Sequence, residues 1–271
     1  MTKSLNTSSK RAIARTDTAP ELNLTKIGIV ARDYRYKFSN GYRDFSHVLP
    51  ALLKLLDSKG CDSVLFSLFS IIPRRGFDVR SAFNNLKNIK SIFIEEFKDG
   101  DIREAGRYVV YYKTRRGWEE YNFYQVFGTI TKMPQSKIDD FVNNEVPKRI
   151  LGNCCVLLCG EINGVKYSKD CKQVKDLYGL RAAIPKGVNI VLNPIHDRMT
   201  RFEMKLKRQF LSRANRLVIS VWNKGKEDKR GKVKDGRKPP WTIFHNGNEK
   251  EVDRLQNEFG IEIGIFDTSN I

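Results

Sequence analysis

Apolar residues recur along this chain in two patterns, as short uninterrupted runs and as stretches with helical spacing. The runs at residues 24–31 and 63–69 are typical of buried strands. Between them the leucines of residues 45–58 recur at helical spacing, and Gly60 follows as a helix terminator. A strand, a helix and a strand in this order predict a βαβ unit with two parallel strands.

The rest of the pattern alternates strands with helices and adds antiparallel strands. Apolar runs predict strands at residues 91–97, 108–114, 120–131, 155–158, 189–193, 217–223, 241–245 and 261–267. Helical spacing predicts helices at residues 79–86, 136–143, 177–185 and 200–215. The first three of these strands predict an antiparallel meander. No internal repeat is present, so the pattern indicates one α/β domain of two packed sheets flanked by helices.

The beginning of the chain differs from everything that follows it. Residues 1–23 are rich in Ser, Thr, Lys and Arg and lack apolar periodicity, which predicts a disordered tail. Residues 24–271 predict a single domain, with a basic glycine- and lysine-rich loop at 224–238. No apolar signal segment begins near Met1 and no run is long enough to cross a bilayer, so we expect a cytoplasmic protein that does not enter a membrane.

The five cysteines argue against a metal centre. They form no paired C-x-x-C motifs, so the sequence predicts no zinc site and fits a reducing compartment. No Walker loop, G-x-G-x-x-G or H-E-x-x-H motif is present either. We therefore expect no bound metal and no cofactor.

The net charge of +18 raises the question of an acidic partner. Seven basic residues and one acid lie between Arg198 and Arg216, and eight basic residues and three acids lie between Lys224 and Lys238. Together these segments predict a surface for nucleic acid, a nucleotide or an acidic protein. A solvated helix face followed by a solvated loop has the same composition, so both interpretations stand.

The most informative stretch is residues 153–164, N-C-C-V-L-L-C-G-E-I-N-G. A short apolar run ends there at Cys159, followed by Gly160 and Glu161. A cysteine on a sharp turn after a buried strand is placed as a nucleophile would be. Free cysteine is also among the most buried residue types, so a core position is the alternative.

The order of segments resembles the carbon–nitrogen hydrolase, or nitrilase, superfamily over most of residues 24–268. K-I-G-I-V-A-R, G-T-I-T-K-M-P-Q-S, N-C-C-V-L-L-C-G-E-I and V-N-I-V-L-N-P-I-H are similar to its first strand, lysine segment, nucleophile strand and following strand. The resemblance implies a four-layer α-β-β-α sandwich that forms a homodimer. It also implies hydrolysis or transfer at an amide, ureide or nitrile carbon of a small molecule.

The resemblance also implies roles for individual residues. Cys159 takes the place of the nucleophile, and Lys132 that of the lysine that stabilises the tetrahedral intermediate. The amide N–H of Gly160 is the natural second donor to an oxyanion, because it follows the nucleophile. Glu161 is expected to support the site rather than to act as base. His196, at the end of the following strand, is a candidate for the substrate pocket.

One family feature is absent from the sequence. Ser67 and Leu68 stand where the family has proline and its base glutamate, and leucine cannot accept a proton. Glu95 and Glu96 on the next predicted strand are candidates for a relocated base. Two functions follow: a thiol-dependent enzyme acting on a C–N bond, or a catalytically degenerate member that binds or regulates through its basic surface.

Overall fold

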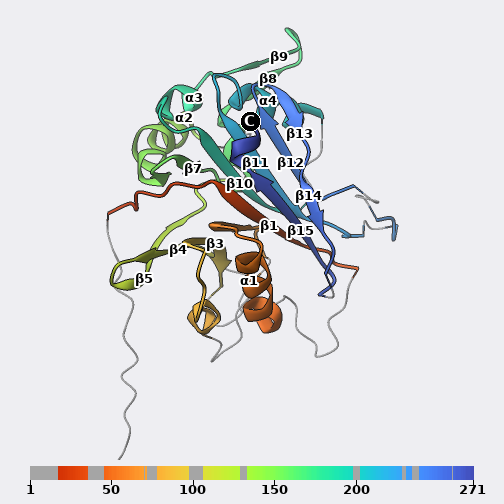
Figure 1. Cartoon of the computed structure of the whole chain (residues 1–271). Coiled ribbons are helices and arrows are strands. Elements are labelled where there is room, and N and C mark those ends of the chain that lie inside the picture. Colours follow the sequence, from red (N-terminus) through yellow and green to blue (C-terminus); the bar gives the residue numbers. More distant parts are fainter. Residues whose placement is uncertain are drawn as a thin grey trace, which may run out of the picture.

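Two large β-sheets lie face to face in the middle of the molecule (Figure 1). The computed structural model describes residues 18–35, 46–69, 71, 78–97, 106–128, 133–197, 202–227, 230–233, 238–257 and 259–271. Each sheet buries both of its faces, because one face packs against the other sheet and the opposite face packs against helices. This burial explains why many of its strands are continuous apolar runs in the sequence.

The first sheet has seven strands in the order β14-β15-β1-β2-β3-β4-β5. Their bounds are Asp253–Leu255, Ile261–Asp267, Lys26–Arg32, Ser63–Phe66, Ser91–Glu96, Arg107–Thr114 and Gly117–Tyr124. Strands β1, β2 and β3 are parallel, and β3, β4 and β5 form an antiparallel meander. The predicted βαβ unit and the predicted meander are therefore both confirmed.

The second sheet has six strands in the order β13-β12-β11-β10-β7-β6. Their bounds are Asn248–Lys250, Trp241–His245, Leu217–Asn223, Ile190–Asp197, Cys154–Val156 and Ile150–Leu151. Strands β7, β10 and β11 are parallel, so their carboxyl ends meet at one edge. A separate hairpin pairs β8 (Lys166–Ser168) with β9 (Gln173–Lys175).

Helices cover the two outer faces and complete four layers. Helix α1 (Leu49–Ser58) and the 3-10 helix η2 (Val79–Phe83) pack on the first sheet. Helices α2 (Gln135–Asp140), α3 (Leu180–Ala183) and α4 (Phe202–Leu211) lie on the side of the second sheet, at the opposite end of the view in Figure 1. The expected four-layer α-β-β-α sandwich is thus confirmed.

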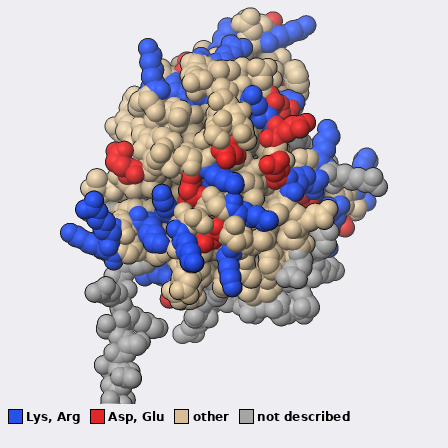
Figure 2. Space-filling view, in the orientation of Figure 1, with Lys and Arg blue, Asp and Glu red and all other residues tan. Residues whose placement is uncertain are grey.

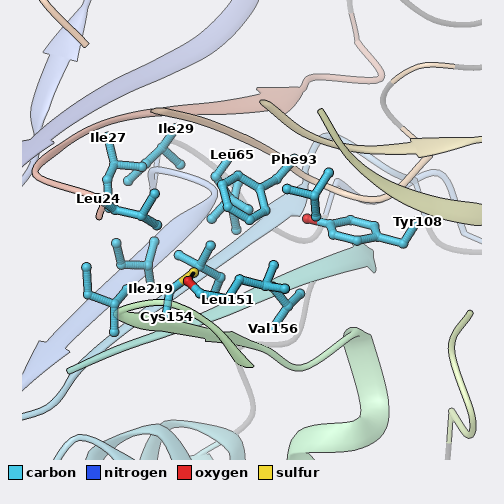
Figure 3. Packing of buried hydrophobic residues seen from close by; sticks show 14 of the residues in the cluster. Leu24, Ile27, Ile29, Leu65, Phe93, Tyr108, Leu151, Cys154, Val156 and Ile219 are labelled. Atoms are coloured by element: carbon cyan, nitrogen blue, oxygen red, sulfur yellow. Dashed lines mark hydrogen bonds between the residues drawn. The ribbon is translucent and has the colours of Figure 1, made fainter. Parts of the chain in front are cut away.

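The core between the sheets is made by the inward-facing half of each strand. Figure 3 shows Leu65 and Phe93 of the first sheet opposite Cys154 and Val156 of the second. Cys155, next to Cys154, points to the other face and packs under the helices. Alternation along a strand therefore makes both cysteines core residues, because both faces of their sheet are covered.

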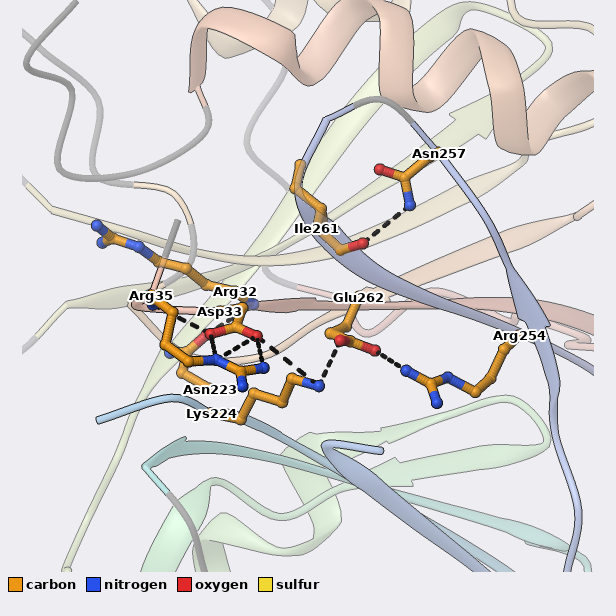
Figure 4. Close-up of polar contacts among 9 residues, drawn as sticks. All are labelled: Arg32, Asp33, Arg35, Asn223, Lys224, Arg254, Asn257, Ile261 and Glu262. Carbon is orange, nitrogen blue, oxygen red and sulfur yellow. Dashed lines mark hydrogen bonds and ion pairs between the residues drawn. The ribbon is translucent and has the colours of Figure 1, made fainter. Parts of the chain in front are cut away.

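The two sheets are joined at one corner by a group of charged residues that we call the Lys224 cluster: Asp33, Arg35, Lys224, Arg254 and Glu262 (Figure 4). Asp33 and Lys224, which follow β1 and β11, form a parallel bridge between the sheets. Lys224 is only 2 % exposed, and its ammonium lies 3.8 Å from the carboxylate of Asp33 and forms an ion pair with Glu262. Buried Asp33 and Lys224 and the more exposed Arg35, Arg254 and Glu262 thus neutralise one another at this corner.

The described chain begins before the predicted boundary of the domain. The backbone carbonyl of Leu22 accepts a hydrogen bond from the amide of Asn153, and Ala19 and Leu22 pack against the inter-sheet core. Residues 18–23 thus belong to the packed structure, whereas residues 1–17 of the predicted tail lie outside the described residues. Among the helices that the structure describes, none is long and apolar enough to cross a membrane.

Candidate active site

Cys159 lies on a strained turn directly after β7. It begins the 3-10 helix η7 (Cys159–Gly164) with a backbone φ of +43°, which is uncommon for a residue other than glycine. Its thiol is half-buried. The side-chain amide of Asn193 on β10 donates to the carbonyls of Leu157 (2.6 Å) and Cys159 (3.3 Å), which fixes the turn from the neighbouring strand. The turn therefore presents the thiol at the end of the strand rather than inside the core.

Contacts of Gly160 and Glu161 fix the conformation of this turn. A Cβ on Gly160 would lie 1.6 Å from the carbonyl oxygen of Gly128, so only glycine fits there. The buried carboxylate of Glu161 accepts the amide N–H groups of Leu158 and Val126, each at 2.7 Å, and pairs with the buried guanidinium of Arg149. These contacts tie Glu161 to the backbone on either side of the turn.

Burial raises the pKa of Glu161 to about 7, although Arg149 and the two amide donors act in the opposite direction. Arg149 was not singled out from the sequence, since an isolated arginine in a polar segment gives no sign that it is fully buried. Its guanidinium also donates to the carbonyl of Tyr124. The pair therefore ties the end of β5 to the turn that carries Cys159.

Lys132 lies outside the described residues. Residues 126–128, which precede it, lie beside the Cys159 turn, because Gly128 is close to Gly160 and the amide of Val126 donates to Glu161. Its position relative to the thiol stays a prediction.

His196 and Glu95 meet between the two sheets. Glu95 is the penultimate residue of β3, on the same face as the core residue Phe93, and His196 lies near the end of β10 on the same face as Leu192. The imidazole Nε2 is 3.5 Å from Oε2 of the Glu95 carboxylate, and the thiol of Cys159 is among the groups that raise the pKa of this imidazole. We call the side chains of Glu95, His196 and Cys159 the Cys159 cluster.

Phe69 holds the imidazole in place. Its ring centroid lies 4.0 Å from that of His196, and it stacks on Phe97 on its other side at 5.2 Å. Phe69 has a φ of +58°, a second strained residue at this site, and its amide donates to Glu95 at 2.9 Å. The carboxylate of Glu95 thus reaches the end of β2 from the neighbouring strand.

The surroundings of His196 favour its protonated form. Burial alone would lower the pKa of this imidazole, but hydrogen bonds to Cys159 and Glu95 and their negative charges outweigh it and raise the pKa to about 9. Tyr108, opposite Glu95 in the register of β3 and β4, is fully buried and burial raises its pKa well above the ordinary value. It therefore faces Glu95 as a neutral phenol.

The two candidates for a relocated base, Glu95 and Glu96, lie on opposite faces of β3. Glu96 points to the opposite face of β3, where it pairs with Arg107 and accepts a hydrogen bond from Tyr111. Alternation along the strand thus turns Glu96 away from the face that carries Glu95 and Phe93. Leu68 is fully buried in the core between the sheets, as its apolar side chain requires.

The basic segments contribute less free charge than their composition suggests. On and after helix α4, the side chains of Lys207, Arg208 and Arg216 are buried. Arg216 donates to backbone carbonyls, and Arg208 lies over the ring of Trp222. Lys224 belongs to the buried Lys224 cluster. Figure 2 shows Lys and Arg spread over the visible face with Asp and Glu among them.

Solved structures similar to this chain include an amidase and a carbon–nitrogen hydrolase. One is a glutamate-to-leucine mutant of the amidase from Nesterenkonia sp. AN1 with the acetamide moiety of fluoroacetamide added covalently at its active-site cysteine: 12% identity, 93% of this chain and 94% of that chain covered, TM-score 0.48. A double mutant of that amidase in complex with acrylamide is 11% identical, with 91% of this chain and 92% of that chain covered and a TM-score of 0.46. A carbon–nitrogen hydrolase from Helicobacter pylori is 10% identical, with 91% of this chain and 90% of that chain covered and a TM-score of 0.45.

No family model and no curated protein sequence matches the chain. At these identities and TM-scores the solved structures say nothing of the reaction.

Proposed function

We propose that this protein is a cysteine-dependent hydrolase or transferase acting at the C–N bond of a small amide, ureide or nitrile. The observation that carries the proposal is the Cys159 turn: a half-buried thiol on a strained backbone at the carboxyl edge of a parallel sheet, in contact with an imidazole. Strained backbone is maintained only where the surrounding structure enforces it, and it clusters at functional sites.

The chemistry follows from the groups around the thiol. The sulfur of Cys159 attacks the amide carbon, and the carbonyl oxygen becomes an oxyanion that the Gly160 amide and Lys132 stabilise. When the C–N bond breaks, the amine leaves with a proton and a thioester remains on Cys159. Water or another acceptor then attacks the thioester carbon and releases the sulfur.

Ammonia release from a panel of short-chain amides, aromatic amides, ureides and nitriles tests this proposal. Parallel reactions with hydroxylamine trap the thioester as a hydroxamate. The matched control is Cys159→Ala, which removes the sulfur and leaves the buried neighbours unchanged. We expect ammonia and hydroxamate from the native protein alone. If no member of the panel gives more product with the native protein than with Cys159→Ala, the hydrolase proposal fails.

The second function is a binding module whose basic surface contacts nucleic acid, a nucleotide or an acidic protein. The observation that favours it is the leucine at position 68, which removes the base from its usual strand. A salt titration with duplex and single-stranded DNA tests it, since each phosphate contact steepens the fall of affinity with salt. The buried positions of Arg208, Arg216 and Lys224 lead us to expect a shallow slope.

A further inference from the structure

We infer that His196 is the acid–base residue of Cys159 and that Glu95 is the residue that positions it, so that the carboxylate absent from β2 is supplied from β3 through an imidazole. This inference rests on the proposed function for the reaction, whereas the pairing of imidazole and carboxylate rests on their 3.5 Å separation.

The geometry begins with the two inner faces. The side chains of Glu95 and His196 come from different sheets and point into the same space at the carboxyl ends of their strands. The carboxylate lies 3.5 Å from Nε2, and the thiol of Cys159 is near enough to the same ring to raise its pKa. Nucleophile, base and orienting carboxylate in contact are the arrangement that activates a thiol.

Glu95 is fixed more firmly than a surface carboxylate. It is 4 % exposed, and its Oε2 accepts the amide N–H of Phe69. A Cβ on Gly106 would lie 2.6 Å from the side chain of Glu95, so the glycine leaves the space that this side chain fills. The stacked ring of Phe69 then restricts the imidazole from its face. Each of these contacts fixes orientation rather than bond chemistry, which makes Glu95 a positioning residue.

The ionisable groups around His196 support the assignment. Glu95 faces it from β3 and Cys159 from η7, while the neighbouring Asp197 pairs with Lys226 instead. Tyr108 faces Glu95 from β4 as a neutral phenol. Glu95 and Cys159, the ionisable residues described as facing the imidazole, are both negative when ionised. Their charge therefore favours the protonated form of His196.

The proton balance closes over one cycle. The imidazole of His196 takes the proton from Cys159, and the thiolate forms the S–C bond. The imidazolium gives this proton to the amide nitrogen as the C–N bond breaks and the amine leaves. In the second half, His196 takes a proton from water while the O–C bond forms and the C–S bond breaks. The acid product leaves, and thiolate and imidazolium are restored.

The rate of alkylation by iodoacetamide, measured for each cysteine by peptide mass spectrometry from pH 5 to pH 10, tests the inference without a substrate. We expect Cys159 of the native protein to react at pH 6 at a rate that His196→Gln lowers about tenfold or more, because the thiolate is the nucleophile and the variant lacks the imidazole that accepts the thiol proton. The exposed Cys171 serves as internal reference in every sample.

Glu95→Gln tests the positioning role, since the amide oxygen still accepts the Phe69 N–H but carries no charge. In the plot of Cys159 alkylation rate against pH, we expect Glu95→Gln to move the inflection at higher pH, which reports His196, to lower pH by about one pH unit or more. Glu95→Asp should recover part of that change. Glu96→Gln, one residue further along β3 and on its other face, is the matched control and leaves the profile unchanged.

The outcomes separate the two levels of the inference. Identical profiles for the native protein and His196→Gln overturn it, even if amides are hydrolysed. A profile that depends on His196 and Glu95, in a protein that turns over no amide, supports the coupled pair and contradicts the proposed function instead. A His196-dependent profile that Glu95→Gln leaves unchanged overturns the role of Glu95.

Discussion

Two polar clusters lie at the carboxyl ends of the parallel strands, and they are built in opposite ways. In the Lys224 cluster each buried charge has an opposite charge beside it: Asp33 has Arg35 and Lys224, and Glu262 has Lys224 and Arg254. In the Cys159 cluster the thiol is half-buried, and the only carboxylate among its three side chains lies 3.5 Å from the imidazole. The charges of the first cluster are paired with one another, whereas the second contains groups that can exchange a proton.

The pKa values express the same contrast. Burial would raise the pKa of Asp33, but the hydrogen bonds and charge of Arg35 and the charge of Lys224 lower it, so the carboxylate stays ionised. The pKa of His196 is raised to about 9, which places its titration within reach of a working enzyme. Saturated ion pairs thus fix a corner of the fold, while an incompletely neutralised group can transfer protons. The following predictions test this difference, from the largest effect to the smallest.

Lys224→Met is expected to cost about 3 kcal/mol of unfolding free energy, because the buried carboxylate of Asp33 and the half-buried carboxylate of Glu262 lose their shared cation and keep only Arg35 and Arg254. Urea denaturation at pH 7 measures the loss. The alkylation rate of Cys159 in the folded variant should not change. A loss below about 1 kcal/mol would show that the corner is not held by charge.

His196→Gln should change how stability depends on pH. The folded pKa of about 9 lies above the unfolded value of about 6.5, so the imidazolium stabilises the fold fully below pH 6.5, and this contribution disappears as the pH rises through 9. It amounts to about 3 kcal/mol at most. Urea denaturation at pH 6 and pH 10 should show a decrease in the native protein that the variant lacks.

The control for that measurement is His245→Gln. Burial and Lys250 lower the pKa of His245, so its contribution has the opposite sign and grows as the pH rises past its folded value. Equal pH slopes in the native protein and His196→Gln would contradict the coupling in the Cys159 cluster.

Gly160→Ala is expected to cost about 1–3 kcal/mol, since the added methyl group would meet the carbonyl of Gly128 and overpack the turn. The alkylation rate of Cys159 should fall as well, because the turn must move. Gly187→Ala is a suitable comparison, as nothing lies within 4 Å of a Cβ there. Thermal denaturation and peptide mass spectrometry give the two readouts.

Gly106→Ala should have the smallest effect on stability, about 1 kcal/mol, since the added Cβ meets the side chain of Glu95 rather than backbone. The displaced carboxylate should move the upper inflection of the Cys159 profile to lower pH. In the Glu95→Gln background the same substitution should leave the profile unchanged, because the charge that it displaces is already gone. Additive effects of the two substitutions would separate Gly106 from the Cys159 cluster.

The sequence alone determined the layers of this protein and the edge at which its candidate chemistry lies. Period-two alternation fixed which residues of each strand face inward, so S-I-F-I-E-E already divides Glu95 from Glu96 once the inner face is known. The apolar run before Cys159 predicted a strand end, and the structure has one there. Local patterns suffice for these features because they depend on neighbours along the chain.

Only the tertiary structure decided which side chains meet. The sequence suggested His196 as a pocket residue and Glu95 as one of two carboxylates, but not that they touch. Their contact depends on the spacing and stagger of the two sheets, on the positive φ of Phe69 and on the space left at Gly106. Packing of residues distant in sequence sets these quantities, and no local pattern records them. Likewise, the burial of Lys224 and Arg208 follows from where their elements dock, although their composition resembles that of a solvated surface.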